Sequence, residues 1–339
     1  MTDRIIECVP NFSEGRDAAR IGQIAQAITS VDGVRLLNVD SGAAANRTVM
    51  TFAGEPGSVA EAAFRAVMKA AEVIDMGCHC GEHPRIGATD VCPIVPVRGV
   101  TMEECVEYAR ALARRVGESG IPVYCYENAA FVPERRNLAA CRSGEYEGIR
   151  KKIADERWKP DFGPSEYNDR IRRSGISVIG ARKYLVAINF NLDTDSAGIA
   201  SEIARDVREI GRKIVENGCE RWQRGTLKGC KAIGWYIKEY GIAQVSMNVT
   251  DIDVTPVHAA YEEVCRCARK RGVRVTGSEL IGLVPGRVLL EAGIFYAERE
   301  SQNAAGLNES ELMELAVKSM GLADLRPFDY KKRVIEYLL

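Results

Sequence analysis

Apolar and polar positions along the first third of this chain follow an order of strands and amphipathic helices. Coarse periodicity predicts strands at 4–9, 34–40, 47–53 and 91–97, and helices at 17–29 and 57–74. In the second helix Val59, Ala63 and Val67 fall on one face, after a break marked by Gly54 and Pro56. The order β-α-β-β-α-β is typical of a split βαβ unit, whose two helices cover one sheet face.

The same order returns in the second half. There the pattern predicts a strand in KYLVAINFNL, a helix at 196–216, strands in CKAIGWYIK and IAQVSMNV, a helix at 256–270, a strand at 272–276 and the glycine-broken apolar segment ELIGLVPG. We therefore expect an α+β fold of two tandem ferredoxin-like α/β sandwich units, residues 1–180 and 181–339. Their sheets are expected to face a central cleft or tunnel.

Segments outside these two patterns are also expected to be ordered. The first half continues with a helix near 102–117 and a strand at 121–126, and the tail holds a helix in SELMELAVKSM. Residues 143–180 carry Trp158, Pro160 and Phe162 close together, which indicates an ordered linker between the units.

Composition narrows the possible partners. The 339 residues are 46% hydrophobic and 27% charged, and the formal net charge is -1, so no overall field attracts nucleic acid or an anionic membrane. An anionic substrate must then meet a local basic cluster. The N-terminus has no apolar run, and no stretch of about 18 apolar residues occurs. These features predict a cytoplasmic protein whose eleven spread cysteines are mostly buried thiols.

Two of the three histidines lie in one segment, DMGCHCGEHPRIGATDVCP, at positions 79 and 83. An imidazole has an unperturbed pKa of about 6.5, so it can accept and return a proton within one turnover. His83 stands on a loop between Glu82 and Pro84, with glycines at 81 and 87. The pattern alone leaves two interpretations open, a catalytic histidine or a hydrogen-bonded structural one.

A metal site is a rival interpretation of the same segment. Cys78, His79, Cys80, His83 and Cys92 offer sulfur and imidazole ligands that zinc accepts, although C-H-C-x-x-H is not a familiar ligand spacing. The chain has no GxxxxGK[ST] loop, no strand-GxGxxG-helix unit and no GxSxG elbow. Nucleotide-driven, nicotinamide and serine-hydrolase chemistries therefore lose support.

A second polar cluster lies in the turn between the predicted strands at 34–40 and 47–53. It comprises Asp40, Ser41, Asn46, Arg47 and Thr48. Small residues beside it suit a tight turn or the close approach of a ligand. Basic side chains near the expected site loops are those of Arg47, Arg85, Arg98, Arg182 and Lys183. Guanidinium groups among them suit two-pronged binding of carboxylates.

Longer motifs identify a family. These are CVPNFSEGR at 8–16, NVDSG and NRTV within 38–49, HCGEHPRIGATDVCP at 79–93, GEYEGI at 144–149, PDFGPS at 160–165, GARKYLVAINFNL at 180–192, KAIGWY with AQVSMN within 231–248, and the terminal IEYLL. Together they resemble the formiminotransferases over nearly the whole chain. The resemblance implies transfer of a formimino group from N-formimino-L-glutamate to N5 of tetrahydrofolate, the co-substrate.

The resemblance also implies roles for individual residues. His83, the histidine of GEHPR, is the expected catalytic residue, and Gly163, Pro164 and Ser165 begin a segment that contributes to a positively charged folate tunnel. It further implies a homodimer and no metal. The chain departs from the family pattern at Asn38, where Asp is more frequent, and at Cys80, where a basic residue is more frequent.

For the chemistry we expect one imidazole to serve twice. His83 would take the proton of N5 and return one to the departing nitrogen, with Asp40 or Glu82 orienting the ring or handling a second proton. Substrate carboxylates would be bound by residues drawn from Asn46, Arg47, Arg85, Arg182 and Lys183. Three alternatives remain: formyl transfer, a metal-assisted amidine hydrolase using Cys78, Cys80 and His83, and a non-catalytic folate-binding protein.

Overall fold

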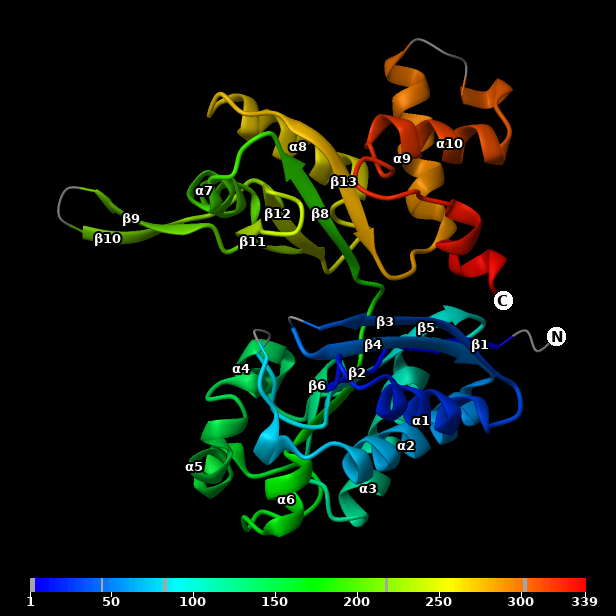
Figure 1. The fold of residues 1–339 in the computed structure, drawn as a ribbon, viewed down its shortest axis with the longest axis vertical. Coiled ribbons are helices and arrows are strands. Elements are labelled where there is room, and N and C mark those ends of the chain that lie inside the picture. Colours follow the sequence, from blue (N-terminus) through cyan, green and yellow to red (C-terminus); the bar gives the residue numbers. More distant parts are fainter. Residues whose placement is uncertain (1–3, 44, 82–83, 217–218, 301–303) are drawn as a thin grey trace. The chain divides into compact units, whose positions relative to one another are not determined.

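The computed structural model describes residues 4–43, 45–81, 84–216, 219–300 and 304–339, and the chain divides into two compact units, Met1–Lys183 and Tyr184–Leu338 (Figure 1). Unit 1 contains, in chain order, β1 (Ile5–Cys8), β2 (Asn11–Phe12), α1 (Ala18–Thr29), β3 (Val34–Gly42), β4 (Arg47–Gly54), α2 (Pro56–Val73), the 3₁₀ turn η1 (Met76–Cys78), β5 (Thr89–Arg98), α3 (Met102–Glu118), β6 (Val123–Glu127), η2 (Pro133–Arg136), α4 (Leu138–Arg142), η3 (Tyr146–Gly148), α5 (Ile149–Ala154), η4 (Glu156–Trp158), α6 (Asp169–Ser174) and β7 (Ser177–Ala181).

The helix starts in unit 1 follow from local sequence. Asp17 precedes α1, and its side chain accepts hydrogen bonds from two backbone N–H groups of the first turn. Pro56 occupies the first turn of α2, where its missing N–H costs nothing. At α3, Thr101 and Glu104 form a capping box, each side chain bonding the backbone of the other. These caps explain why the predicted starts lie within one residue of the observed ones.

The sheet of unit 1 has the strand order β3-β4-β1/β2-β5-β7-β6, with β1 and β2 both between β4 and β5. Strands β3 to β5 pair antiparallel, whereas β5, β7 and β6 pair parallel. One row of neighbouring residues therefore crosses the sheet: Asp40, Val49, Asn11, Val91, Val178 and Tyr124. Because β5, β7 and β6 run parallel, the loops that precede these three strands lie at the same end of the sheet.

Two apolar clusters hold unit 1 together. The larger packs α1, α2 and α3 against the sheet through buried side chains such as Phe52, Cys92 and Ile179. Figure 1 shows these three helices on one face of the sheet. The smaller joins Val91, Val178 and Tyr124 to residues of α4, α5 and α6. Burial of apolar area on this scale is the main source of folding free energy.

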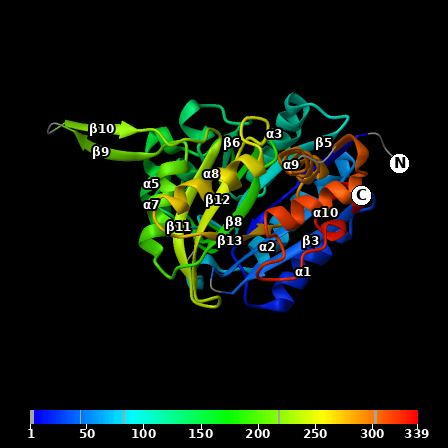
Figure 2. The ribbon, with the colours of Figure 1, turned by 90° about the horizontal axis from the view of Figure 1, so that it is seen from above.

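Unit 2 contains β8 (Val186–Leu192), α7 (Ala197–Val207), β9 (Arg212–Glu216), β10 (Cys219–Gln223), β11 (Cys230–Ile237), β12 (Ile242–Val249), α8 (Val257–Arg269), β13 (Val275–Ile281), α9 (Gly286–Arg299), η5 (Ala304–Gly306), α10 (Glu309–Ser319), η6 (Tyr330–Lys332) and η7 (Ile335–Tyr337). Its four-stranded sheet is antiparallel, with the order β11-β12-β8-β13, and α7 to α10 share one apolar core with it. The β9–β10 hairpin extends away from this sheet (Figures 1 and 2).

Helices and strands are mixed in both units, so the predicted α+β class is confirmed at that level. Several predicted elements are wrong in detail. The helix expected at 196–216 ends at Val207, because Arg208 is extended and Gly211 adopts φ 68° before strand β9. The strand expected at 272–276 runs from Val275 to Ile281, through Gly277, and α9 was not predicted.

The segment 143–180 is part of unit 1 and not a separate linker. It supplies η3, α5, η4, α6 and β7, and β7 lies between β5 and β6 in the sheet. This strand could not be predicted from the sequence, because a strand of five residues, Ser177–Ala181, is too short to show an alternation of apolar and polar positions. No helix in the described part of the chain is long and apolar enough to span a bilayer.

Candidate active site

The residue expected to be catalytic, His83, and its neighbour Glu82 lie outside the described residues. The chain on both sides of them is described, from η1 to Gly81 and from Pro84 into β5. The site is therefore defined by how these two flanks are held. Four segments distant in sequence hold them.

The N-terminal flank is bonded to the turn between β3 and β4. Nδ2 of Asn46 donates to the carbonyl oxygen of Cys80 at 2.9 Å, and Nε2 of His79 lies 2.9 Å from the carbonyl oxygen of Asn46. Asn46 adopts φ 48°, a left-handed conformation that asparagine tolerates better than most residues. A Cβ on Gly81 would collide with the carbonyl of Ala45, so the two backbones are in close approach.

The segment NFSEGR lies between this turn and the C-terminal flank. The backbone N–H of Gly15 donates to Oδ1 of Asn46 at 2.9 Å, so both ends of that amide side chain are hydrogen-bonded. Oγ of Ser13 donates to the carbonyl oxygen of Gly87 at 2.7 Å. Residues 13–15 thus connect the β3–β4 turn to the chain that follows His83.

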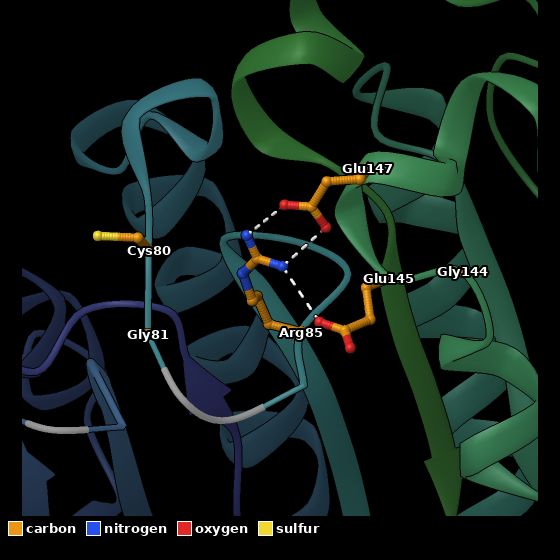
Figure 3. Close-up of a pocket in the computed structure, with 6 residues that line it drawn as sticks. All are labelled: Cys80, Gly81, Arg85, Gly144, Glu145 and Glu147. Carbon is orange, nitrogen blue, oxygen red and sulfur yellow. Dashed lines mark hydrogen bonds and ion pairs between the residues drawn. The ribbon is translucent and has the colours of Figure 1, made fainter.

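Arg85 fixes the C-terminal flank through all of its guanidinium donors. Its Nη2 donates to Oε1 of Glu147 at 2.7 Å and to the carbonyl oxygen of His79 at 3.3 Å. Its Nη1 donates to Oε2 of Glu147 at 2.9 Å and to Oε2 of Glu145 at 3.2 Å. The fifth donor, Nε, is 3.3 Å from Nδ1 of His79. Figure 3 shows the fork of Arg85 directed at the two glutamates, while the Cys80 side chain points away from it.

An open pocket of about 490 Å³ lies beside these ion pairs (Figure 3). It is lined by Cys80, Gly81, Arg85, Gly144, Glu145 and Glu147. Gly144 and Glu145 have φ values of 85° and 51°, and this paired left-handed backbone turns both glutamates of GEYEG toward Arg85. The pocket therefore lies directly alongside both flanks of the expected catalytic position.

The net effect of hydrogen bonds, nearby charges and burial raises the pKa of Arg85 and lowers those of Glu147 and His79. The hydrogen bonds that Arg85 donates to Glu147 raise the pKa of Arg85, and the same bonds lower the pKa of Glu147. Desolvation lowers the pKa of His79, and the charge of Arg85 lowers it further, against a raising effect of its hydrogen bond to Asn46. At neutral pH the cluster thus holds an ionised Arg85–Glu147 pair beside an uncharged imidazole.

The start of β5 is anchored independently. The backbone N–H of Ile86 donates to Oδ1 of the buried Asp90 at 3.0 Å, and Asp90 is ion-paired with Arg142 of α4. The N–H of Ile176 donates to the carbonyl oxygen of Ile86 at 3.0 Å, and that of Ala88 donates to Ser174 at 2.8 Å. The chain after His83 therefore enters the sheet along a fixed path.

Arg47 and Asp40 lie near this edge on neighbouring strands. Arg47 begins β4, and its Nη2 donates to Oδ1 of Asn11. Burial lowers the pKa of Arg47 to about 10, with the charge of Asp90 opposing that shift. The group remains a cation at neutral pH. Asp40 is exposed on β3, opposite Val49, two residues along β4 from Arg47.

The remaining predicted residues lie elsewhere in unit 1. Gly163, which adopts φ 87°, contacts Ile121 just before the start of β6, and Pro164 and Ser165 follow it. These residues lie at the same end of the strands as Arg85, but β6 is two strands away from β5. Arg182 and Lys183 follow the end of β7. Because β7 runs parallel to β5, these two residues lie at the opposite end of the strands from Arg85. The structure thus does not gather all the predicted cations.

The described members of the metal-ligand alternative do not converge. Both ring nitrogens of His79 have protein partners, and Sγ of Cys92 lies in the core 3.6 Å from Sγ of Cys8. Among the described residues, no group of three His, Cys, Asp or Glu side chains is placed to bind a metal ion.

Sequence reasoning missed the partners of Arg85. Glu145 and Glu147 stand about 60 positions away in the chain, and His79 was assigned no part in holding the loop. The motif GEYEG was a usable signal, because its two glutamates carry carboxylates that can pair with a guanidinium fork.

Known proteins resemble this chain from end to end. The model of the formiminotransferase domain, N-terminal subdomain, matches residues 5–182, and that of the formiminotransferase domain matches residues 187–339. Formimidoyltransferase-cyclodeaminase of Sus scrofa is 47% identical over 337 residues, which are 99% of this chain and 60% of that protein.

Shorter relatives match nearly in full. Glutamate formimidoyltransferase of Streptococcus pyogenes serotype M1 is 43% identical over 298 residues, 88% of this chain and 94% of that protein. Its counterpart in Thermoplasma acidophilum is 42% identical over 313 residues, 91% and 96% of the two chains. The chain thus spans about 60% of the longer curated relatives and nearly all of the shorter ones. With both family models matched in sequence along its length, this protein belongs to the formiminotransferase family.

Proposed function

We propose that this protein is an enzyme, a glutamate formimidoyltransferase that moves the formimino group of N-formimino-L-glutamate to N5 of tetrahydrofolate. The observation that carries the proposal is the anchoring of both flanks of His83. Asn46 holds Cys80 on one side, and Glu147 holds Arg85 on the other. The two shorter relatives, both named glutamate formimidoyltransferase, also support it.

In this mechanism His83 is the proton shuttle. As N5 attacks the amidine carbon, a neutral imidazole takes its proton, and the same ring then protonates the departing glutamate nitrogen. Asp40 or Glu82 orients the ring or handles a second proton. Acid-base help of this kind accounts for about 10²–10⁴-fold, so fixed placement of two bound substrates must supply much of the remaining acceleration.

Substrate binding is divided among several residues in our proposal. Arg47 is the favoured carboxylate-binding cation near the His83 loop, since partial burial weakens its hydration and strengthens its pairing with an anion. Gly163, Pro164 and Ser165, with Arg182 and Lys183, contact folate. The hydrogen bonds of Asn46 and Arg85 support a different role for these two residues: they hold the loop and do not contact the substrate directly.

We also propose that the two units, Met1–Lys183 and Tyr184–Leu338, are two formiminotransferase subdomains, each built on a ferredoxin-like unit. The order β3-β4-β1/β2-β5 in one sheet and β11-β12-β8-β13 in the other supports this, because the two orders correspond strand by strand. The enzyme is proposed to act in the cytoplasm as a homodimer, without a metal cofactor.

A direct assay tests the proposal. Purified protein is mixed with tetrahydrofolate and either N-formimino-L-glutamate or N-formyl-L-glutamate, and the folate product and glutamate are followed by mass spectrometry. We expect 5-formiminotetrahydrofolate to form faster than the formyl product, at a rate unaffected by chelators. Preference for the formyl donor, release of ammonia without folate, or folate binding without turnover would each favour one of the alternatives.

A further inference from the structure

His79 occupies the junction of the two flanks of the candidate active site. Nε2 lies 2.9 Å from the carbonyl oxygen of Asn46, and Nδ1 lies 3.3 Å from Nε of Arg85. The backbone carbonyl of His79 also accepts from Nη2 of Arg85 at 3.3 Å. One half-buried residue therefore contacts both the β3–β4 turn and the guanidinium that follows His83.

The chemistry of the two partners determines where the proton of His79 resides. Arg85 Nε is a donor and cannot accept, so Nδ1 must present its lone pair. The carbonyl of Asn46 can only accept, so Nε2 must carry the hydrogen. Both contacts are satisfied together only by the neutral imidazole protonated at Nε2. The protonated ring would direct an N–H at the Arg85 N–H and break that contact.

We infer that His79 is a positioning residue for the reaction: as a neutral, Nε2-protonated imidazole it ties Asn46 to Arg85 and so fixes the ends of the segment that carries His83. The inference rests on the proposed function only for its kinetic consequence. Its structural part, the tautomer and the two contacts, stands independently.

The charged surroundings of His79 make this arrangement sensitive to pH. The groups that act on it are Arg85 of its own loop, Glu14 and Arg16 ahead of α1, and Glu147 of η3. Burial and Arg85 lower the pKa of His79, while Glu14 raises it. Protonation below that pKa would place a second cation against Arg85. The site should therefore lose its fixed geometry as the pH falls, in addition to any titration of His83.

Two substitutions of His79 distinguish the effect of losing its two hydrogen bonds from the effect of losing its imidazole ring. In His79→Gln the side-chain oxygen can accept from Arg85 and the amide N–H can donate to Asn46, with no ionisation. In His79→Ala both contacts are lost. The matched control is His258→Gln, because His258 lies on α8 of unit 2, stacked on Phe295 with ring centroids 4.6 Å apart.

The kinetic test compares kcat, KM and pH profiles of these variants. We expect His79→Ala to lower kcat by about 10²-fold with KM changed less than about 3-fold, as a misplaced catalytic group does. His79→Gln should recover kcat to within about 5-fold of the wild type. Below both histidine pKa values, log kcat should fall by about 2 per pH unit in the wild type and by about 1 in His79→Gln. Ionisations of the substrates occur in both proteins and cancel in this comparison.

A second measurement needs no turnover. Long-range ¹H–¹⁵N correlation spectra of the three histidines, assigned with the variants, report the tautomer and pKa of each ring. We expect His79 to carry its proton on Nε2 and to titrate below about 6.5. Hydrogen exchange of the amides of Cys80, Gly81, Arg85 and Ile86 should accelerate in His79→Ala and not in His79→Gln or His258→Gln.

Several results would overturn the inference. A proton on Nδ1, a pKa at or above the ordinary value, full kcat in His79→Ala, or equal losses in the Gln and Ala variants would each do so. If the wild type fails to turn over formiminoglutamate while the spectra and exchange data are as expected, the proposed function is wrong and the tie made by His79 stands.

Discussion

Arg85 and Glu147 form a two-pronged ion pair, with Nη2 2.7 Å from Oε1 and Nη1 2.9 Å from Oε2. The pair joins the residue two positions after His83 to η3, which lies 62 positions further along the chain. Parallel hydrogen bonds of this kind fix the plane of the guanidinium as well as its distance. The orientation of the loop after His83 is therefore set from outside the loop.

Loss of the Glu147 charge should disturb catalysis more than folding. In Glu147→Gln one acceptor oxygen remains but the ion pair is lost, so Arg85 turns toward Glu145 and the loop shifts. We expect kcat to fall about 10-fold, since displacement of a catalytic group by about 1 Å is costly. Glu134→Gln, at an exposed position of η2, is the matched control. Unchanged kcat in Glu147→Gln would argue against this role for the pair.

The same pair predicts a defined pH dependence of stability. Its hydrogen bond from Arg85 lowers the pKa of Glu147 in the folded state. The stabilisation is thus fully present above the unfolded glutamate pKa of about 4.3 and is lost as the pH falls through the lower folded value. Denaturant unfolding of wild type and Glu147→Gln should differ by a constant amount above about pH 5 and converge toward pH 3. A difference that grows on acidification has the wrong sign for this account.

Gly81 should not tolerate a side chain. An added Cβ would collide with the carbonyl oxygen of Ala45 and push the N-terminal flank away from the β3–β4 turn. We expect Gly81→Ala to lower kcat by about 10-fold or more, while thermal unfolding changes little because the loop is exposed. Gly148→Ala, where an added Cβ meets no atom within 4 Å, should retain full activity. Similar activities of the two variants would show that this close approach is unimportant.

Arg47 should act in substrate binding. Lysine keeps the charge but cannot present two parallel donors, so Arg47→Lys should raise KM for formiminoglutamate about 10-fold with a smaller change in kcat. The control is Arg98→Lys, at the exposed end of β5. Steady-state kinetics at saturating folate measure both values. A fall in kcat alone, at constant KM, would place Arg47 in the chemical step instead.

The elements predicted correctly from local sequence are those in which the periodicity of apolar residues and the capping residues indicate the same boundaries. Helices α1, α2 and α3 are of this kind, because their apolar spacing and their capping residues give the same boundaries to within one residue. The strand β7 and helix α9 escaped prediction. One is a five-residue strand whose place is set by pairing with β5 and β6, and the other follows a segment that contains two glycines and a proline.

The candidate site was also predictable only in part, because some of its contacts join segments that are distant in the sequence. His83 and Asn46 stand in motifs whose composition is unusual, so they could be selected from the sequence. The ties of Arg85 to Glu145 and Glu147, and of Gly15 to Asn46, join segments that only the fold brings together. Arg182 resembled Arg85 as a candidate, yet the parallel pairing of β5 and β7 places them at opposite strand ends.

The central claim is that His83 transfers the protons of formimino transfer from a loop held by its two flanks. Single-turnover mixing of His83→Ala with tetrahydrofolate and formiminoglutamate tests this most directly, with folate binding measured on the same protein. We predict unchanged folate affinity and a transfer rate lower by about 10²–10⁴-fold, the contribution of general acid-base catalysis. Transfer at the wild-type rate, with folate bound normally, would contradict the account.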